Sequence, residues 1–219
     1  GKAVVAQGGG PTAVINQSLV GAVLEARKYD HITHVYGARH GVRGIVEEDF
    51  LDLSQATTHN LEMVAHTPSS GLGSTRDKPD EEYCAKIFQV LRAHGVRYFY
   101  YAGGNDSADT CRIVNENANR AGYELRVIHI PKTIDNDVGF VSRTFGFFSA
   151  VEEACRVLDC AHTEATSVPG GIGLVKLMGR QSGHIAASAA LAQGDANFVL
   201  IPEVSFDLEG EKGFMKCLE

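Results

Sequence analysis

Residues 125–137 read Leu-Arg-Val-Ile-His-Ile-Pro-Lys-Thr-Ile-Asp-Asn-Asp. Residues 125–130 are mostly apolar and β-branched, which is typical of a buried strand in a parallel sheet, and Pro131 ends that strand. The polar residues that follow therefore lie at the carboxyl end of a strand, the edge at which open α/β sheets bind their ligands. The stretch predicts an α/β fold with an active-site loop over residues 131–137.

Two carboxylates and one cation give this loop its chemistry. Asp135 and Asp137 alternate along the chain, so one can act as a general base while the other holds a metal ion or keeps its neighbour ionised. Lys132 supplies positive charge for a migrating anion. The alternative is an Asx-rich turn with solvated carboxylates, and composition alone favours that turn.

Two other stretches repeat the order of buried strand, glycine turn and helix. A strand over 3–6 precedes Gly8-Gly9-Gly10-Pro11 and a helix expected over 12–28, and a strand over 96–102 precedes the turn 103–107. Backbone N–H groups at such a turn, together with the positive end of a helix dipole, bind phosphate, so we expect an anion site at each turn. Further strands are expected over 33–38, 172–177 and 198–201. One helix is expected to be capped by Asp80 and ended by Gly95, a second to follow residues 143–147 and reach about His162, and a third to span 182–192.

A hydroxyl-rich loop, residues 69–76, reads Ser-Ser-Gly-Leu-Gly-Ser-Thr-Arg and ends in a cation. Such a loop is suited to wrapping an anionic group. The alternative is that Asp77 or Asp80 pairs with Arg76. The sequence therefore adds Arg76 to the predicted anion-binding residues.

Composition limits the class of protein. The chain has 219 residues, of which 44% are hydrophobic, and a net charge of −7, which argues against nucleic acid or an anionic membrane as partner. No apolar run approaches the roughly 20 residues of a membrane span, and the amino end does not resemble a signal peptide, so we expect a cytoplasmic protein. The 5 cysteines include no Cys-x-x-Cys pair, which indicates reduced thiols and neither a disulfide framework nor a zinc site.

The loop Pro-Lys-Thr-Ile-Asp-Asn-Asp at 131–137 closely resembles the catalytic loop of the phosphofructokinase family. The resemblance implies that Asp135 takes the proton from the C1 hydroxyl of the sugar and that Asp137 assists it and helps to hold magnesium (Mg2+). Thr133 belongs to the same catalytic and substrate-binding loop. ATP-using members of the family carry glycine where Lys132 stands, whereas pyrophosphate-using members carry lysine, so this chain has the pyrophosphate form.

The first glycine turn also resembles a family motif. Residues 8–16 are similar to the opening phosphate loop, especially in the pyrophosphate-dependent branch, which implies donor contacts at Gly9 and Gly10. In the family, an arginine at the position of Arg76 contacts the transferring phosphate. We therefore expect Arg76 to have that role.

The second glycine turn, Gly103-Gly104-Asn105-Asp106-Ser107, implies donor contacts at Gly104, Asp106 and Ser107. ATP-using members carry Gly-Gly-Asp-Gly-Ser there, and pyrophosphate-using members usually carry Gly-Gly-Asp-Asp-Ser. Asn105 thus stands where the family has its magnesium aspartate, and it can coordinate only through a neutral carbonyl oxygen. Asp106 is expected to repel and crowd the α-phosphate of a nucleotide.

Met-Gly-Arg at 178–180 and Pro-Glu at 202–203 resemble the segments with which the family holds fructose 6-phosphate. The implied substrate-binding residues are Met178, Gly179, Arg180 and Glu203. From the residues alone, Arg180 as a cap or ion-pair partner and Glu203 as the partner of a helix N-terminus remain alternatives. Gly171 departs from the arginine that many bacterial members place there, and the basic residues that bind the sugar's 6-phosphate in the family come after Glu219.

Together these resemblances imply a Rossmann-like three-layer sandwich with a mostly parallel sheet, plus part of a second, similar α/β domain. Residues 1–142 would bind the phosphoryl donor, and 143–219 would form an incomplete sugar-phosphate domain. The implied activity is transfer of a phosphoryl group from pyrophosphate to the C1 hydroxyl of fructose 6-phosphate by a homo-oligomer, a dimer or tetramer. The alternatives are an ATP-dependent phosphofructokinase, which Gly-Ile-Gly-Leu-Val-Lys at 171–176 supports, and a non-catalytic regulatory subunit that binds sugar phosphate.

Overall fold

The computed structural model describes residues 1–218. The chain forms two compact units, Gly1–Thr133 (unit 1) and Ile134–Glu219 (unit 2), and each is described here by itself. This division falls inside the predicted catalytic loop. The functional boundary expected between residues 142 and 143 remains a prediction.

Strands and helices alternate along most of unit 1. In chain order its elements are β1 (Lys2–Gln7), α1 (Ile15–Ala26), β2 (His34–Ala38), α2 (Val42–Val46), β3 (Phe50–Asp52), α3 (Thr58–Ala65), α4 (Glu81–Ala93), β4 (Val96–Gly103), α5 (Asn105–Arg120) and β5 (Arg126–Pro131). The strands expected over 3–6, 33–38, 96–102 and 125–130 are confirmed as β1, β2, β4 and β5. The sequence did not predict β3 or α3.

The strands form one sheet in the order β3-β2-β1-β4-β5. β1 pairs in parallel with β2 and β4, and β4 pairs in parallel with β5, whereas β3 is antiparallel to β2. In register, Gln7 lies opposite Ala102, which lies opposite Ile130. The segments that follow β1, β4 and β5 therefore emerge at the same edge of the sheet.

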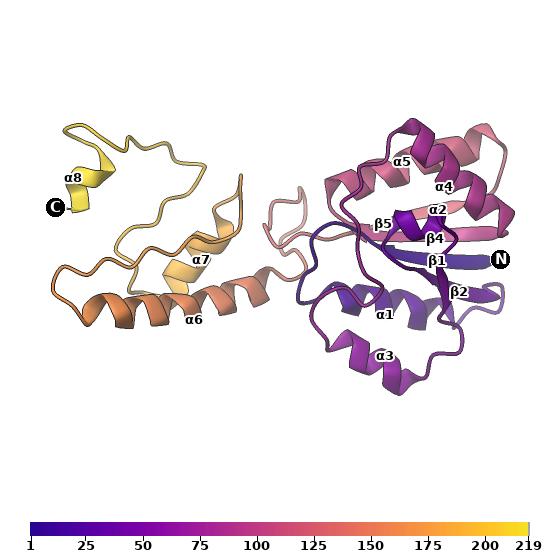
Figure 1. Ribbon diagram of the computed structural model, residues 1–219, viewed down its shortest axis with the longest axis horizontal. Coiled ribbons are helices and arrows are strands. Elements are labelled where there is room, and N and C mark those ends of the chain that lie inside the picture. Colours follow the sequence, from indigo (N-terminus) through magenta and orange to yellow (C-terminus); the bar gives the residue numbers. More distant parts are fainter. Residues whose placement is uncertain (219) are drawn as a thin grey trace. The chain divides into compact units, whose positions relative to one another are not determined.

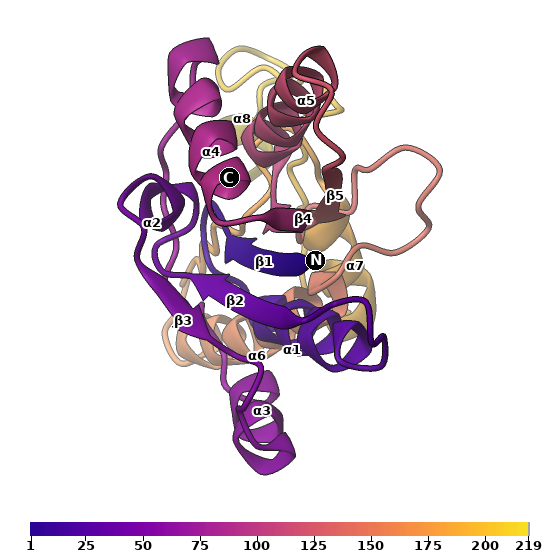
Figure 2. The same ribbon diagram turned by 90° about the vertical axis from the view of Figure 1, so that its right-hand side faces the viewer.

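Helices cover both faces of this sheet, with α1 and α3 on one side and α2, α4 and α5 on the other (Figures 1 and 2). Alternate residues of β1 supply the two cores, because successive side chains of a strand point to opposite faces. Ala3 and Val5 pack in the core that contains Leu19 of α1, and Val4 packs in the core that contains Leu91 of α4. The predicted α/β three-layer sandwich is confirmed for unit 1.

β5 corrects one detail of the prediction. A fully buried strand was expected over 125–130, but β5 lies at the end of the sheet and is partly exposed, with Ile128 at 45%. In unit 1, β4 is its hydrogen-bonded neighbour. An apolar run therefore identified the strand correctly but not its place at the edge.

Two helix boundaries show what local signals predict well. Asp80 was expected to cap a helix, and its side chain accepts a hydrogen bond from the backbone N–H of Tyr83 (2.8 Å) at the start of α4. Gly95 follows that helix with a φ of 68°, as a helix-ending glycine does. By contrast, α1 begins at Ile15 and not near Thr12, and residues 11–14 have no regular secondary structure.

Unit 2 consists of helices and irregular segments over its described residues, 134–218. Its helices are α6 (Phe147–Thr166), α7 (His184–Gln193) and α8 (Phe214–Leu218), and α6 packs on α7 through Phe147, Ala154, Ile185 and Ala189. The strands predicted over 172–177 and 198–201 are wrong for this structure. A strand requires a hydrogen-bonded partner, and these segments have none among residues 134–218.

Among the described residues, no helix combines the length and the apolar character that crossing a membrane requires.

Candidate active site

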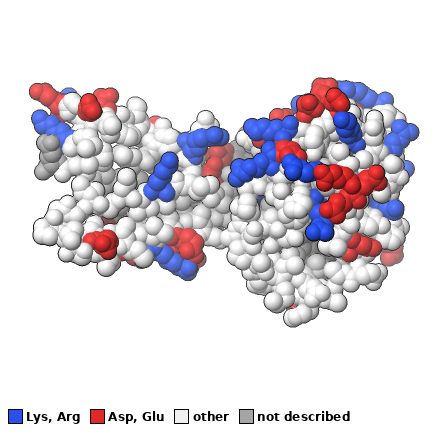
Figure 3. Space-filling view, in the orientation of Figure 1, with Lys and Arg blue, Asp and Glu red and all other residues white. Residues whose placement is uncertain are grey.

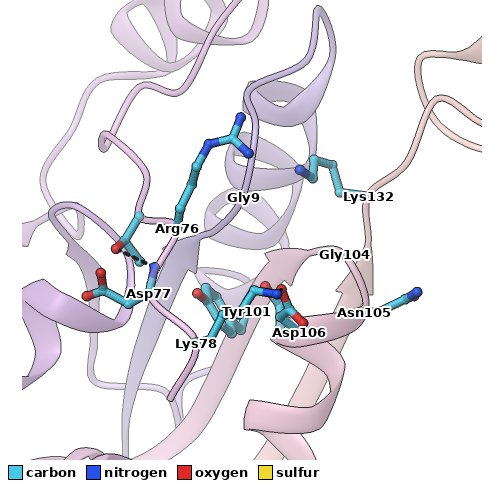
Figure 4. Close-up of a pocket in the computed structure, with 11 residues that line it drawn as sticks. Gly9, Arg76, Asp77, Lys78, Tyr101, Gly104, Asn105, Asp106 and Lys132 are labelled. Atoms are coloured by element: carbon cyan, nitrogen blue, oxygen red, sulfur yellow. Dashed lines mark hydrogen bonds and ion pairs between the residues drawn. The ribbon is translucent and has the colours of Figure 1, made fainter. Parts of the chain in front are cut away.

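A cavity of about 230 Å³ lies in unit 1 where the turns after β1, β4 and β5 meet (Figure 4). It is lined by Gly9, Thr75, Arg76, Asp77, Lys78, Tyr101, Gly104, Asn105, Asp106, Ser107 and Lys132. The structure thus brings together the donor-side residues that the sequence predicted, except Gly10. Thr75, Asp77 and Lys78 were missed although they adjoin Arg76 in the sequence, and Tyr101 was included only as part of the strand expected over 96–102.

The turn after β1 is held in place by hydrogen bonds from its backbone N–H groups to neighbouring segments. The N–H of Gly8 donates to the carbonyl of Ala102 (2.7 Å), and the N–H of Gly9 donates to the carbonyl of Thr75 (2.8 Å). Gly9 has a φ of 74°, which glycine adopts without strain. Because both amides are paired and α1 begins only at Ile15, the prediction of bare N–H groups at a helix N-terminus is wrong for Gly8 and Gly9.

Two buried carboxamides hold the loop 67–73 against the end of β1. Gln7 is 0% exposed and Asn16 is 1% exposed, and Gln7 Nε2 donates to Asn16 Oδ1 (3.0 Å). Gln7 Oε1 accepts the N–H of Leu72 (3.0 Å), and Asn16 Oδ1 accepts the N–H of Gly71 (2.7 Å). A buried carboxamide costs free energy unless it is hydrogen-bonded, so the loop and these two side chains stabilise each other.

The same loop continues into the wall of the cavity. Ser74 Oγ donates to the carbonyl of Gly9 (2.5 Å), which joins the loop to the turn after β1 just before Arg76. Sequence analysis missed Gln7 and Asn16 as positioning residues. The available signal was a carboxamide at the end of the apolar strand 3–6 and another on the buried side of the following helix.

Two cations, Arg76 and Lys132, point into the same space from opposite walls (Figure 4). Lys132 Nζ donates to the carbonyl of Gly10 (2.6 Å), so Gly10 contacts a residue that lines the cavity without lining it itself. The pKa of Lys132 is lowered from its usual value, first by burial and second by repulsion from Arg76. An anion between the two cations would relieve that repulsion, so this part of the cavity favours an anionic ligand.

Ion pairs fix the wall that carries Arg76. Arg43 of α2 binds Asp77 in a bidentate manner, with Nη2 2.6 Å from Oδ1 and Nε 3.1 Å from Oδ2. The hydrogen bond from Arg43 is the main cause that lowers the pKa of Asp77. Asp77 therefore pairs with Arg43, and Asp80 caps α4, so neither aspartate is the main ion-pair partner of Arg76.

Figure 3 shows Lys and Arg side chains beside Asp and Glu side chains in the upper part of unit 1.

The turn after β4 brings the start of α5 to the cavity. Lys78 Nζ lies 3.5 Å from Asp106 Oδ2, and Figure 4 shows these side chains together near Tyr101. The side chain of Asn105, a predicted metal ligand, extends away from them in the same view. Ser107 is buried beneath the turn.

The part of the predicted catalytic loop that lies in unit 2, residues 134–137, is held by hydrogen bonds to its backbone and to one side chain. The carbonyl of Asp135 accepts a hydrogen bond from Ser182 Oγ (2.7 Å), and Asn136, with a φ of 58°, accepts the N–H of Thr144 through Oδ1 (2.8 Å). The pKa of Asp135 is raised, first by burial and second by repulsion from Asp137, while Arg180 lowers it. A raised pKa makes Asp135 a stronger base than an ordinary aspartate.

The other predicted sugar-side residues lie in the segments around α7. Met178 and Arg180 are exposed, and Gly179 has a φ of 109°. Glu203 accepts the N–H of Gly183 through Oε1 (2.8 Å), which lowers the pKa of Glu203. The carboxylate thus complements the start of α7, one of the alternatives raised by the sequence. Among residues 1–218, no group of three or more His, Cys, Asp or Glu is arranged to hold a metal ion.

Comparison with known proteins places these features in a family. A family model described as Phosphofructokinase matches residues 2–217. The chain is 58% identical over 214 residues to pyrophosphate–fructose 6-phosphate 1-phosphotransferase of Rhodospirillum rubrum, covering 95% of this chain and 52% of that protein. It is 36% identical over 223 residues to ATP-dependent 6-phosphofructokinase of Borreliella burgdorferi, covering 100% of this chain and 48% of that protein.

The fold is similar to solved structures as well. The pyrophosphate-dependent phosphofructokinase of Nitrosospira multiformis superimposes with a TM-score of 0.82 at 35% identity, over 94% of this chain and 54% of that chain. The chain spans about half the length of the curated relatives it matches.

The glycine turn after β4 generates a stability prediction. A Cβ at Gly103 would lie 2.0 Å from Ser107 Oγ and 2.5 Å from Ser107 Cβ, whereas a Cβ at Gly104 would meet only the carbonyl of Lys132 at 3.9 Å. We expect Gly103→Ala to lower the free energy of unfolding by about 1–3 kcal/mol because of overpacking, and Gly104→Ala to lower it much less. Urea unfolding of both variants measures the difference, and equal losses would contradict the prediction.

Proposed function

Because the chain belongs to the phosphofructokinase family, we propose that this protein transfers a phosphoryl group from pyrophosphate to the C1 hydroxyl of fructose 6-phosphate. The product would be fructose 1,6-bisphosphate, formed reversibly in glycolysis. The observation that carries the proposal is the cavity of unit 1, which Asp106 and Lys132 both line. The similarity of the chain to the relative from Rhodospirillum rubrum, whose name states this activity, supports the same donor.

The cavity suits a short anion with concentrated charge. Arg76 and Lys132 point into one space, and the lowered pKa of Lys132 reflects its burial and their repulsion. Pyrophosphate between them would neutralise both cations. A nucleotide would also have to bring its α-phosphate and sugar past the carboxylate of Asp106, with the costs of crowding and of like-charge repulsion. Gly9, Gly10, Gly104 and Ser107 complete the proposed donor site.

Asp135 is the proposed general base. It would take the proton of the C1 hydroxyl as the C1 oxygen forms a bond to the terminal phosphorus and the bond from that phosphorus to the bridging oxygen breaks. Inorganic phosphate leaves. Burial and repulsion from Asp137 raise the pKa of Asp135, which strengthens it as a base, while Arg76 and Lys132 balance the charge on the transferring group. Thr133 would bind the sugar beside the base.

Magnesium is the proposed cofactor, and the residues of the loop fit it. Burial and, second, repulsion from Asp137 raise the pKa of Asp135, and a cation near Asp137 would relieve the repulsion. Proteins usually hold Mg2+ through one or two carboxylates plus the phosphates of the substrate, without a cage of their own. Asp137 would hold the ion, and Asn105 would offer a carbonyl oxygen. When bound, magnesium neutralises charge on the phosphates.

Unit 2 would supply the sugar contacts. Arg180 is close enough to Asp135 to lower its pKa, which supports a place for Met178, Gly179 and Arg180 beside the base. Glu203, which is bonded to Gly183, would order the same segment. We keep residues 1–142 as the proposed donor domain and 143–219 as part of the sugar-phosphate domain. A cytoplasmic homo-oligomer also remains a prediction from the sequence.

An ATP-dependent phosphofructokinase is the second candidate. The similarity to the relative from Borreliella burgdorferi, named as ATP-dependent, favours it. Asp106 and Lys132 oppose it because the ATP-using branch is expected to carry glycine at both positions. The two residues come from different turns and favour the same donor, so we place pyrophosphate first.

Donor preference tests the proposal. Steady-state rates of the natural protein with fructose 6-phosphate and magnesium should give a higher kcat/KM for pyrophosphate than for ATP. The double change Asp106→Gly with Lys132→Gly should shift the ratio toward ATP by about 10-fold or more, because it removes both the crowding and the ammonium that attracts the short anion. A natural protein with the higher kcat/KM for ATP would promote the second candidate.

The base assignment predicts a pH dependence. Because burial and Asp137 raise the pKa of Asp135, the acid limb of kcat/KM should lie above the value of about 3.9 for an ordinary aspartate. The pH dependence of kcat/KM reports ionisation in the free protein, in which no cation relieves the repulsion. Asp137→Asn removes that repulsion, so Asp135 ionises at lower pH and the acid limb should move to lower pH, whatever the loss in rate. The measurement is the pH profile of kcat/KM for both proteins.

A matched change provides the control for this profile. Asp135→Asn keeps the shape of the side chain but removes the proton acceptor, so kcat should fall by about 10²-fold or more. Near-normal turnover of Asp135→Asn, or an acid limb that does not move in Asp137→Asn, would show that another group is the base.

A further inference from the structure

Arg43 is linked to the donor cavity, which is the cavity of unit 1 that Arg76 and Lys132 line, only through a contact with Asp77. It belongs to α2 and is not among the described residues that line the cavity. Its guanidinium binds both carboxylate oxygens of Asp77, at 2.6 and 3.1 Å. Bidentate guanidinium–carboxylate pairs fix orientation as well as distance.

Asp77 connects this pair to three other parts of unit 1. Its Oδ2 accepts the hydroxyl of Tyr83 on α4 (3.1 Å), and its own N–H donates to Thr75 Oγ1 (3.1 Å). The carbonyl of Thr75 in turn accepts the N–H of Gly9 (2.8 Å). Burial and Asp77 raise the pKa of Tyr83 to about 12, so its hydroxyl stays protonated and remains a donor. Arg43 is therefore linked through Asp77 to the glycine turn.

The segment 75–80 needs such contacts because it has no helix or strand of its own. It nevertheless carries Arg76 and Lys78, which both line the cavity. The side chain of Asp77, between them in sequence, is engaged by α2 and α4. Holding the middle residue fixes the backbone from which the two cations project, and it lowers the conformational entropy that they lose on binding a ligand.

We propose that Arg43 is a positioning residue for the phosphoryl donor, acting through Asp77 to hold Arg76 and Lys78 at the cavity. This inference rests on the proposed function, since it takes pyrophosphate as the donor. Arg43 makes no contact with the donor itself. Its loss loosens the segment 75–80, so pyrophosphate binds more weakly while the sugar side is unaffected.

The test compares Arg43→Met with a matched control, Arg39→Met. The two arginines have similar exposure, 55% and 57%, and each pairs with an aspartate, but the partner of Arg39 is Asp49, which does not line the cavity. Calorimetric titration with pyrophosphate should show about 5- to 10-fold weaker binding for Arg43→Met than for the unchanged protein and little change for Arg39→Met. In steady-state assays, KM for pyrophosphate should rise while KM for fructose 6-phosphate stays constant.

Two further variants separate positioning from direct contact and from a general loss of structure. In an Asp77→Asn background, Arg43→Met should cost less than in the unchanged protein, because the contact through which it acts is already weakened. Arg43→Lys should restore part of the affinity. An undiminished loss in the Asp77→Asn background would mean that Arg43 touches the donor and would overturn the inference. An equal rise in both KM values would mean a general structural role and would also overturn it.

Failure of the inference is distinguishable from failure of the proposed function. If the unchanged protein binds pyrophosphate and Arg43→Met binds it equally well, the inference is wrong and the proposed function stands. If the unchanged protein neither binds pyrophosphate nor uses it as a donor, both are wrong.

Discussion

The cavity of unit 1 depends on two buried carboxamides that bond to each other and to a distant loop. The side-chain oxygens of Gln7 and Asn16 accept the N–H groups of Leu72 and Gly71, so these two side chains cannot be buried without the loop that satisfies them. These hydrogen bonds hold the loop that leads to Arg76 against the end of β1. The sheet alone would place the turns after β1, β4 and β5 side by side but would leave the cavity without this wall.

The charged residues that line the cavity determine which ligands it can bind. Arg76 and Lys132 repel each other, and burial together with this repulsion lowers the pKa of Lys132. The carboxylate of Asp77 is paired with Arg43. The carboxylate that a ligand in the cavity would meet is therefore that of Asp106 on α5, which has Lys78 beside it. A short anion gains from the two cations, whereas a longer one also meets a carboxylate.

Local signals in the sequence predicted much of this arrangement and missed what depends on distant partners. The strand over 3–6 and the cap at Asp80 are local, and both were correct. The role of Gln7 was missed because its loop partners lie more than 60 residues away in the chain. The strands expected over 172–177 and 198–201 failed for a related reason, since an apolar run becomes a strand only beside a partner.

Hydrogen exchange of the backbone amides of Gly71 and Leu72, followed by NMR on the 219-residue chain, tests the central claim most directly. Both amides are donated to buried side chains, so the account predicts that they exchange as slowly as amides of β1, and that Asn16→Ala speeds the exchange of Gly71. Exchange of both amides at the rate of an unstructured peptide would contradict the claim that Gln7 and Asn16 fix the loop of the donor cavity.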